Sequence, residues 1–292
     1  MNKSQPATKP APEQEGGPGK PLPRILFVVN PIAGGNDKSE FLEELEDMAS
    51  ELGFAYELLM TTGKDDNQQI KQKIEQFEPE TVAAVGGDGT CNMVAQLLID
   101  TEMKLGIIPF GSANGMANEL GISDTPKKAV QTLLQGKRKT IDIIEINNQH
   151  RCLRISDIGI NARMIKRFEK SKRRGMLSYA RYFFDELYES RPKKIRLHFT
   201  DGRILKKRVH MVAFANATRY GTGATINPQG KLDDGKFEIC LIKNISFRAF
   251  FALLWAFFTG KTGDTEHIEI YSCREIEVTL KKYRTMQMDG EL

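Results

Sequence analysis

The chain has 292 residues, 40% of them hydrophobic, and a formal net charge of +4. A chain of this length suits two domains with separate cores, and so mild a charge does not favour nucleic acid as a partner. The four cysteines lie far apart without a C-x-x-C pair, which argues against a disulfide framework or a zinc site and predicts reduced thiols in a cytoplasmic protein. The sequence leaves the oligomeric state open, a homodimer included.

Residues 1–23 contain Pro, Gly, Gln, Lys and Glu with almost no apolar side chains. Such a segment cannot bury enough apolar surface to fold, so it predicts a disordered tail, and it lacks the apolar stretch of a secretory signal. The longest apolar run, from Ala249 to Phe258, is about half of what a membrane-spanning helix needs. We therefore do not expect an integral membrane protein.

From Arg24 the sequence alternates between apolar runs typical of buried strands and apolar residues at helical spacing. Asp37 and Glu40 suit a capping box at the start of the first helix. The alternation predicts a parallel sheet with helices on both faces, which is a three-layer α/β domain over residues 24–140. Its expected strands are 25–29, 56–60, 82–85 and 105–108, and its expected helices are 41–52, 70–77, 93–99, 117–120 and 129–134.

After about Thr140 the pattern changes to short apolar runs joined by turns such as Asn147-Asn148 and Asp201-Gly202. Helical spacing returns at 176–189 and 247–258. We expect a second, β-rich domain over residues 141–292, built as an antiparallel β-sandwich-like fold, so that the whole chain is α/β plus mostly-β. Its expected strands are 141–146, 151–155, 195–200, 209–215, 237–242, 268–271 and 276–281.

A glycine-rich segment, Gly86-Gly87-Asp88-Gly89-Thr90, follows the third expected strand and precedes a helix. Glycine lets backbone N–H groups approach an anion closely, and a helix N-terminus adds partial positive charge. The carboxylate of Asp88 would repel phosphate unless a metal ion lay between them. The segment therefore predicts a site for a nucleotide with Mg²⁺.

Two more segments rich in small residues follow the first and fourth expected strands, at 30–35 and 108–117. Ligands of parallel sheets bind at the carboxyl ends of the strands, so the three segments are expected to form one nucleotide-binding site. Each segment alone could be an ordinary turn or helix cap. None carries the Walker A pattern or the glycine spacing of a dinucleotide-binding fold.

Five segments follow one another in a characteristic order. They are Asn30-Pro31 with Gly34-Gly35, Gly86 to Thr90 with Asn92, Pro109 with Gly111-Ser112 and Asn114, Pro228 with Asp233 to Phe237, and Asp289-Gly290-Glu291. This ordered set resembles the diacylglycerol kinase catalytic-domain family, within the wider group of sphingosine kinases and bacterial lipid kinases. The resemblance runs from Arg24 to the last residue. GGDGT alone is less specific, because NAD kinases and phosphofructokinases carry similar signatures.

The resemblance implies an enzyme of phospholipid metabolism that binds ATP between its domains and transfers the γ-phosphoryl group to a lipid hydroxyl. It implies a Mg²⁺ ion held by Asp234 and the backbone carbonyls of Lys231 and Lys236. It places Asp88, Asp289 and Glu291 in the catalytic machinery, with Glu291 as general base. The implied nucleotide contacts are Asn30, Pro31, Ala33, Gly34, Thr61, Gly86, Gly87, Asp88, Gly89, Thr90, Asn92 and Ser112.

The acceptor lipid stays open, because Gly115 and Asn161 stand where relatives often have Asp. Diacylglycerol, related acylglycerols and sphingoid lipids are all compatible. A lipid substrate implies peripheral contact with a membrane surface, for which the apolar helix at 247–258 and the basic run at 166–174 are candidates. Both segments also have plainer interpretations, as a core helix and a solvated face. The alternatives to a lipid kinase are a soluble NAD kinase-like phosphotransferase and a nucleotide or lipid sensor without turnover.

Overall fold

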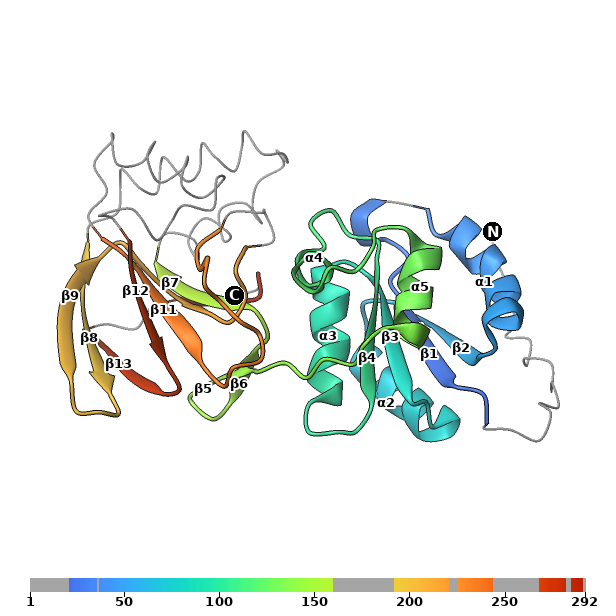
Figure 1. Cartoon of the computed structure of the whole chain (residues 1–292), viewed down its shortest axis with the longest axis horizontal. Helices are drawn as coiled ribbons and strands as arrows, with labels where there is room; N and C mark the ends of the chain where they lie inside the picture. Colours follow the sequence, from blue (N-terminus) through green and yellow to red (C-terminus); the bar gives the residue numbers. More distant parts are fainter. Residues whose placement is uncertain are drawn as a thin grey trace. The chain divides into compact units, whose positions relative to one another are not determined.

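The computed structural model describes residues 21–35, 37–159, 192–220, 225–243, 268–281 and 285–290 (Figure 1). The chain divides into two compact units, Met1–Arg138 and Lys139–Leu292. Several sequence expectations lie outside the described residues: the tail up to residue 20, the basic run at 166–174, the helices at 176–189 and 247–258, Asn161 and Glu291. Within the described ranges, no helix is both long and apolar enough to span a membrane.

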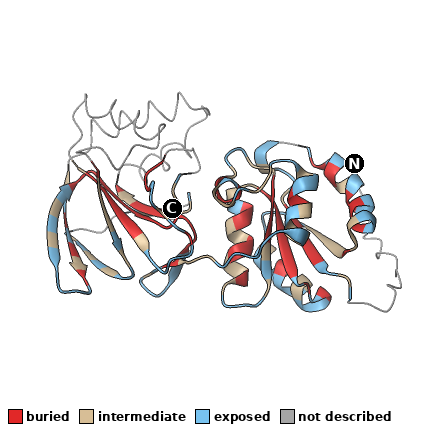
Figure 2. Ribbon diagram, in the orientation of Figure 1, coloured by how far each residue is buried: buried red, intermediate tan, exposed pale blue. Residues whose placement is uncertain are grey.

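The first unit is built on a four-stranded parallel sheet with the strand order β2-β1-β3-β4. The strands pair in parallel throughout, as predicted from their separation by helices. The two central strands are almost entirely buried, which explains why they appear in the sequence as unbroken apolar runs (Figure 2). The strands are β1 (Arg24–Val29), β2 (Ala55–Met60), β3 (Thr81–Gly86) and β4 (Lys104–Pro109).

Helices cover both faces of this sheet, which confirms the predicted three-layer α/β unit (Figure 1). Phe27 lies in a buried cluster with Phe41 and Leu45 of α1 and Val130 of α5. Helices α2 and α3 contact each other and strands β1 and β3, and right-handed crossovers place them on the other face. The helices are α1 (Ser39–Leu52), α2 (Asp66–Phe77), α3 (Asp88–Leu98), α4 (Gly115–Leu120) and α5 (Pro126–Gln135), with a 3₁₀ turn η1 (Ala33–Gly35).

Two local predictions in this unit are wrong. Helix α3 begins at Asp88 and not near residue 93, so Gly89 and Thr90 belong to its first turn. The expected capping box of α1 does not form, because Asp37 instead accepts hydrogen bonds from the N–H of Ser39 at 3.0 Å and from its hydroxyl at 2.7 Å. Both errors concern helix starts, where short polar residues can bond to the backbone in more than one way.

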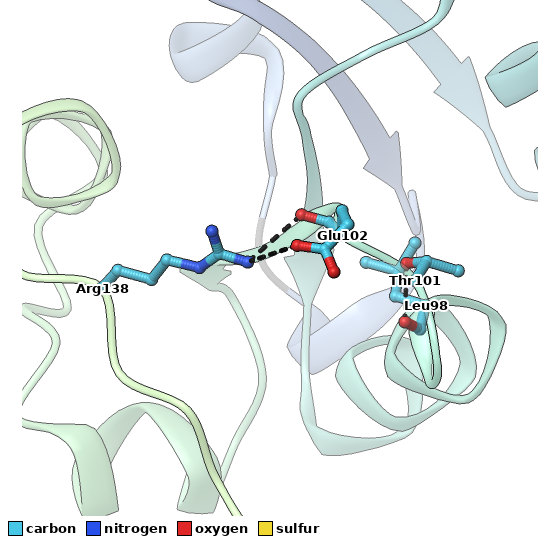
Figure 3. Close-up of polar contacts among 4 residues, drawn as sticks. All are labelled: Leu98, Thr101, Glu102 and Arg138. Atoms are coloured by element: carbon cyan, nitrogen blue, oxygen red, sulfur yellow. Dashed lines mark hydrogen bonds and ion pairs between the residues drawn. The ribbon is translucent and has the colours of Figure 1, made fainter.

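Arg138, the last residue of the first unit, is held against the turn between α3 and β4 (Figure 3). Its guanidinium donates to the carbonyl of Glu102 at 3.2 Å and lies 3.9 Å from the carboxylate of the same residue. The turn is closed by the hydroxyl of Thr101, which donates to the carbonyl of Leu98 at 2.7 Å. These contacts keep the chain packed on the α/β unit as far as Arg138, the last residue of that unit.

The second unit is a sandwich of two antiparallel sheets with a small hairpin, as predicted. One sheet has the order β12-β11-β10-β7-β14 and the other β13-β8-β9. Their inner faces form one core, in which Leu197 and Val209 of one sheet cluster with Phe214 and Ile239 of the other. The strands are β5 (Ile144–Ile146), β6 (His150–Cys152), β7 (Ile155–Gly159), β8 (Lys193–Phe199), β9 (Ile204–Val209), β10 (Met211–Ala215), β11 (Phe237–Ile242), β12 (Ile268–Cys273), β13 (Ile276–Leu280) and β14 (Met286–Met288).

Three predictions from the sequence pattern are wrong in this unit. The single strand expected at 151–155 is interrupted between β6 and β7. Strand β9 was missed and its end merged with β10, because its outward residues are basic and hide the alternation of Leu205 and Val209. Strand β14 was also missed, since its three residues are too few to show a period.

Glu269 on β12 sits in a small ion-pair network at the side of the sandwich. Its carboxylate lies 2.8 Å from the ammonium of Lys207 and 2.6 Å from that of Lys243, and it accepts the hydroxyl of Tyr271 at 2.8 Å. Burial alone would raise the pKa of Glu269, but these hydrogen bonds outweigh it and lower the pKa to about 2. A carboxyl with a lowered folded-state pKa stabilises the fold above its unfolded-state pKa of about 4.3 and loses that contribution as the pH falls toward 2.

We expect Glu269→Gln to lower the free energy of unfolding by about 1 kcal/mol at pH 7, the usual scale for a partly exposed network. The difference from the wild type should shrink as the pH falls below about 5, because the wild-type carboxylate then loses its advantage. Urea unfolding at pH 7, 5 and 3 measures it, with the exposed Glu275→Gln as the control. A difference that stayed constant down to pH 3 would contradict the assignment.

Candidate functional site

Three connecting segments of the first unit meet at the carboxyl edge of its sheet. We call them loop 1 (30–35, after β1), loop 2 (86–90, after β3) and loop 3 (110–114, after β4). The strand order places β3 between β1 and β4, so loop 2 lies between the other two. The N–H of Asn30 donates to Val85 at 3.0 Å, and that of Phe110 donates to Gly86 at 2.8 Å. The structure thus brings the three segments side by side, as the sequence predicted.

The three loops pack backbone against backbone through glycines. Gly34 has a φ of +67°, and a Cβ on it would overlap the carbonyl oxygen of Phe110 in loop 3. A Cβ on Gly87 would lie only 3.1 Å from the Cα of Gly111, and one on Gly111 would overlap the Cα of Gly87. Side chains are therefore excluded from the contacts that join loop 3 to loops 1 and 2.

Asn30 and Thr90, both predicted nucleotide contacts, bond to each other. The Asn30 side-chain amide donates to the Thr90 hydroxyl at 3.1 Å, while its carbonyl oxygen accepts the N–H of Ile32 at 3.2 Å. Thr90 is buried, and its side chain fills the space that a Cβ on Gly86 would need. The pair fixes loop 1 to the first turn of α3.

Asp88 caps a neighbouring helix. Its two carboxylate oxygens accept the N–H of Gly115 at 3.0 Å and that of Met116 at 3.1 Å, at the start of α4. Asn114, which precedes α4, has a φ of +48° and uses its side-chain oxygen to accept the N–H of Gly111 at 2.7 Å. Asp88 therefore joins loop 2 to the helix that follows loop 3, a role that the sequence interpretation of a metal-directed carboxylate did not contain.

The first turn of α3 has the backbone features for which the sequence predicted anion binding. Gly87 precedes the helix in an extended conformation and offers no side chain to cap it. The first backbone N–H groups of a helix lack intrahelical partners, and the helix dipole makes this end partly positive. Because Gly89 in this turn is exposed, a phosphate can approach these groups.

Lys38 is a member of the site that sequence reasoning missed. Its ammonium donates to the carbonyl of Ala33 in loop 1 at 2.9 Å and lies 5.2 Å from the centre of the Phe110 ring in loop 3. The residue is only 4% exposed, and burial lowers the pKa of its ammonium. A lysine directly before a helix is electrostatically unfavourable there, which is the signal that could have identified it.

The remaining predicted nucleotide contacts lie on or near the same edge. Thr61 follows β2 and donates its N–H to Val29 at 2.8 Å. Pro31 and Ser112 are exposed at the surface of loops 1 and 3. Asn92 lies one turn into α3, where its side-chain oxygen accepts the amide of Gln96 at 3.3 Å.

The predicted metal-binding segment of the second unit, 231–236, is a turn that is exposed except at Leu232 and is tied to Asp142. The Asp142 carboxylate accepts the N–H of Gly235 at 2.6 Å, and its own N–H donates to Leu232 at 2.6 Å. Asp234 accepts the N–H of Lys236 at 3.0 Å through Oδ1, and its Oδ2 has no partner among the described residues. In the part of the chain that the structure describes, no three His, Cys, Asp or Glu residues gather as a metal cluster.

Asp289 anchors the C-terminal segment. Its carboxylate accepts three backbone N–H groups in the bend between β6 and β7, from Leu153 and Arg154 at 2.8 Å and from Ile155 at 3.2 Å. The thiol of Cys152 donates to it at 3.3 Å, and burial together with this carboxylate raises the pKa of the thiol well above its usual range. In the structure the carboxylate thus accepts hydrogen bonds from the backbone, and it fixes the residues that immediately precede Glu291.

Gln287 on β14 adds a second anchor that the sequence did not reveal. Its amide donates to the buried carboxylate of Asp157 on β7 at 2.6 Å, and its side-chain oxygen accepts the N–H of Gly290 at 2.8 Å. The hydroxyl of Ser156 donates to the Gln287 carbonyl at 2.7 Å. The Asp289-Gly290 turn is therefore held to β7 from two sides.

Gly111→Ala should test whether the glycine contacts between loops matter for the site. Because a Cβ on Gly111 overlaps the Cα of Gly87, loop 3 must move away from loop 2. We expect the Michaelis constant for the nucleotide to rise by about tenfold or more, since small displacements of a binding site are costly. Steady-state kinetics measure this. Gly202→Ala is the control, because it strains a turn of the second unit, where φ is +86°, without bringing a Cβ against any other atom. Unchanged kinetics of Gly111→Ala would show that the loops need not touch.

Two family models match the chain, one for each unit. The diacylglycerol kinase catalytic domain matches residues 24–146. The YegS C-terminal NAD kinase beta sandwich-like domain matches residues 155–292. The first match contains all three loops, and the second contains the turn at Asp234 and the Asp289 anchor.

Curated relatives extend over nearly the whole chain. A protein named diacylglycerol kinase from Bacillus subtilis (strain 168) is 24% identical over 278 residues, which cover 92% of this chain and 90% of that protein. A protein named "Probable lipid kinase YegS-like" from Enterobacter sp. (strain 638) is 26% identical over 278 residues, covering 92% and 89%. A crystal structure of a diacylglycerol kinase from Bacillus anthracis str. Sterne has the same fold, with a TM-score of 0.73 at 19% identity over 94% of this chain and 92% of that one.

Proposed function

Because this chain belongs to the diacylglycerol kinase catalytic-domain family and is therefore a kinase, we propose that it transfers the γ-phosphoryl group of ATP to a hydroxyl of diacylglycerol. The observation that carries the proposal is the glycine-packed meeting of three loops at the N-terminus of α3, within the match to a kinase catalytic domain. Phosphoryl transfer depends on positioning and on stabilising phosphate charge, which such a site supplies.

On the donor side, the backbone N–H groups of the first turn of α3 would bind phosphate oxygens, with loops 1 and 3 on either side. Asp88 would act by position, because it fixes α4 against loop 2. Lys38 would keep loop 1 against loop 3 and add a positive charge close to the phosphates. Together these residues orient the nucleotide, which is the larger part of catalysis in this reaction.

A Mg²⁺ ion fits the donor chemistry of the turn at 231–236. The exposed carboxylate of Asp234 and the carbonyl oxygens of Lys231 and Lys236 are hard oxygen ligands of the kind that Mg²⁺ prefers. When bound, Mg²⁺ supplies neutralisation of the negative charge on the phosphates. The Asp142 carboxylate accepts the N–H of Gly235 and the Asp142 N–H donates to Leu232, so this turn is held in shape without using Asp234 Oδ2.

On the acceptor side, Glu291 would accept the proton of the lipid hydroxyl as that oxygen bonds to the γ-phosphorus and the bond to ADP breaks. Glu291 lies outside the described residues, but the turn before it is anchored by Asp289 and Gln287. A base needs such support, because a carboxylate on a loose segment is poorly positioned. The lipid substrate implies contact with the surface of a membrane.

The proposal is tested by incubating the full chain with Mg²⁺ and [γ-³²P]ATP together with diacylglycerol, monoacylglycerol, sphingosine or ceramide in mixed micelles. We expect label in the product of diacylglycerol after thin-layer separation. Label in a sphingoid product instead would show that the acceptor is a sphingoid lipid. Gly115 and Asn161 are the reason for testing that alternative.

A second candidate is an NAD kinase-like phosphotransferase, because the matched C-terminal domain is described as NAD kinase-like. A parallel reaction with NAD and no lipid distinguishes it. Labelled NADP in that reaction, with no labelled lipid in any other, would reject the lipid kinase. Nucleotide binding without any transfer would support a sensor.

A further inference from the structure

The outward face of the three-stranded sheet β13-β8-β9 carries a dense group of cations. The hairpin from Lys193 to Val209 contains seven Lys and Arg residues and one Asp, a net charge of +6, whereas the whole chain carries only +4. The strands alternate, so Ile195 and Leu197 enter the core while their neighbours point outward. We call the outward, exposed cations Lys194, Arg196, Lys206 and Arg208 the basic face.

The register of the sheet places these cations directly opposite one another. Lys194 on β8 pairs with Arg208 on β9, and Arg196 pairs with Lys206. Like charges in directly opposed positions of an antiparallel pair destabilise the sheet. None of the four has a carboxylate partner among the described residues, and the acidic neighbour on this face, Glu277 of β13, lies opposite His198.

Protection of a sheet edge explains only part of this pattern. Strand β9 is an edge strand, and lysine on an edge discourages pairing with other chains. Lys194 and Arg196, however, lie on β8, which is the central strand of the sheet. Cations on β8 directly opposite those on β9 destabilise the sheet and add nothing to the protection of its edge. The pattern therefore points to an anionic partner outside the chain.

We propose that the basic face docks the protein on a bilayer that contains anionic lipids. The choice of a bilayer rests on the proposed lipid substrate, which must be reached at a membrane surface. Clustered Lys and Arg residues are attracted to the negative potential of such a surface. Ile204, an apolar side chain that is 55% exposed, lies on the same side of β9 as Lys206 and Arg208.

The chemistry of the face favours a bilayer over nucleic acid. Proteins that bind single-stranded nucleic acid add aromatic side chains on which bases stack. The outward residues of the three strands include no Phe, Tyr or Trp, and their only aromatic ring is the imidazole of His198. They are Lys194, Arg196, His198, Ile204, Lys206, Arg208, Glu277 and Thr279. An array of four cations beside a single imidazole, without the series of large rings on which successive bases stack, matches a plane of headgroup phosphates better than a nucleic-acid strand.

The test compares the wild-type full chain with the quadruple variant Lys194→Gln, Arg196→Gln, Lys206→Gln and Arg208→Gln. Co-sedimentation with sucrose-loaded vesicles is measured without ATP, for phosphatidylcholine alone and with phosphatidylglycerol added. At about fivefold per cation, the variant should bind the anionic vesicles at least about a hundredfold more weakly. The matched control neutralises four exposed lysines of the first unit, Lys71→Gln, Lys104→Gln, Lys128→Gln and Lys137→Gln.

Anionic-vesicle binding that falls in the quadruple variant, persists in the control and weakens at 0.5 M salt supports the proposal. Equal binding by the variant and the wild type overturns it, as does loss of binding to an RNA oligonucleotide with vesicle binding unchanged. Kinase activity is measured separately in neutral detergent micelles, where the variant should match the wild type. Absence of activity in every protein would count against the proposed function and leave the vesicle result to decide the docking surface.

Discussion

Replacing Asp88 with alanine should lower kcat/KM for lipid phosphorylation by at least about a hundredfold, the scale on which losing a preorganised group slows an enzyme. The carboxylate holds the first two N–H groups of α4 against loop 2, and alanine leaves both without this acceptor. Loss of a helix cap also destabilises the first unit by about 1 kcal/mol, too little to unfold it. Steady-state kinetics and urea unfolding on the same samples separate the two effects.

Two further variants make the Asp88 result specific. Asp88→Asn keeps one oxygen acceptor, so its loss of activity should be smaller than that of alanine. Asp124→Ala removes an exposed carboxylate from the same unit and should change neither activity nor stability. If Asp88→Ala kept kcat/KM within about threefold of the wild type, the carboxylate would be no more than a dispensable cap.

Asp289→Ala should destabilise the second unit by about 3 kcal/mol, because three backbone N–H groups at buried residues lose their acceptor. A change of this size corresponds to a fall in melting temperature of about 10 °C. We also expect activity to be lost below that temperature, since the turn before Glu291 is released. Thermal unfolding and an assay at 20 °C measure the two effects.

The control for this variant is Glu275→Ala, which removes an exposed carboxylate from the turn between β12 and β13. It should leave both the melting temperature and the activity unchanged. If Asp289→Ala kept full stability, water molecules would have to accept the N–H groups of Leu153, Arg154 and Ile155 equally well. That result would contradict the structural role assigned to the carboxylate. Loss of stability with normal activity would show that Asp289 is not needed to position Glu291.

The sequence was sufficient for the features that follow from periodicity and strand order. Unbroken apolar runs such as 25–29 predicted buried parallel strands, and the residues between them predicted helices on both faces. Once the sheet was parallel, the glycine segments at 30–35 and 86–90 had to lie at one edge. The meeting of the loops is therefore a consequence of topology that needs no side-chain detail.

The individual roles within the site could not be predicted, because they depend on contacts between distant residues. Asp88 was expected to face a metal, and only the fold brings Gly115 within reach of its carboxylate. Asp289 was grouped with the catalytic residues, and the bend between β6 and β7 that it binds was itself expected to be a continuous strand. Lys38 appeared to be an ordinary cation until its burial between loops 1 and 3 was known.

The proposed reaction is tested most directly by comparing [γ-³²P]ATP with [α-³²P]ATP as the donor, using the full chain, Mg²⁺ and diacylglycerol in neutral mixed micelles. Transfer of the terminal phosphoryl group predicts a labelled, chloroform-soluble phosphatidic acid from the γ-labelled nucleotide and none from the α-labelled one. Lipid that remains unlabelled while inorganic phosphate or NADP gains the label would contradict the assignment of a lipid kinase.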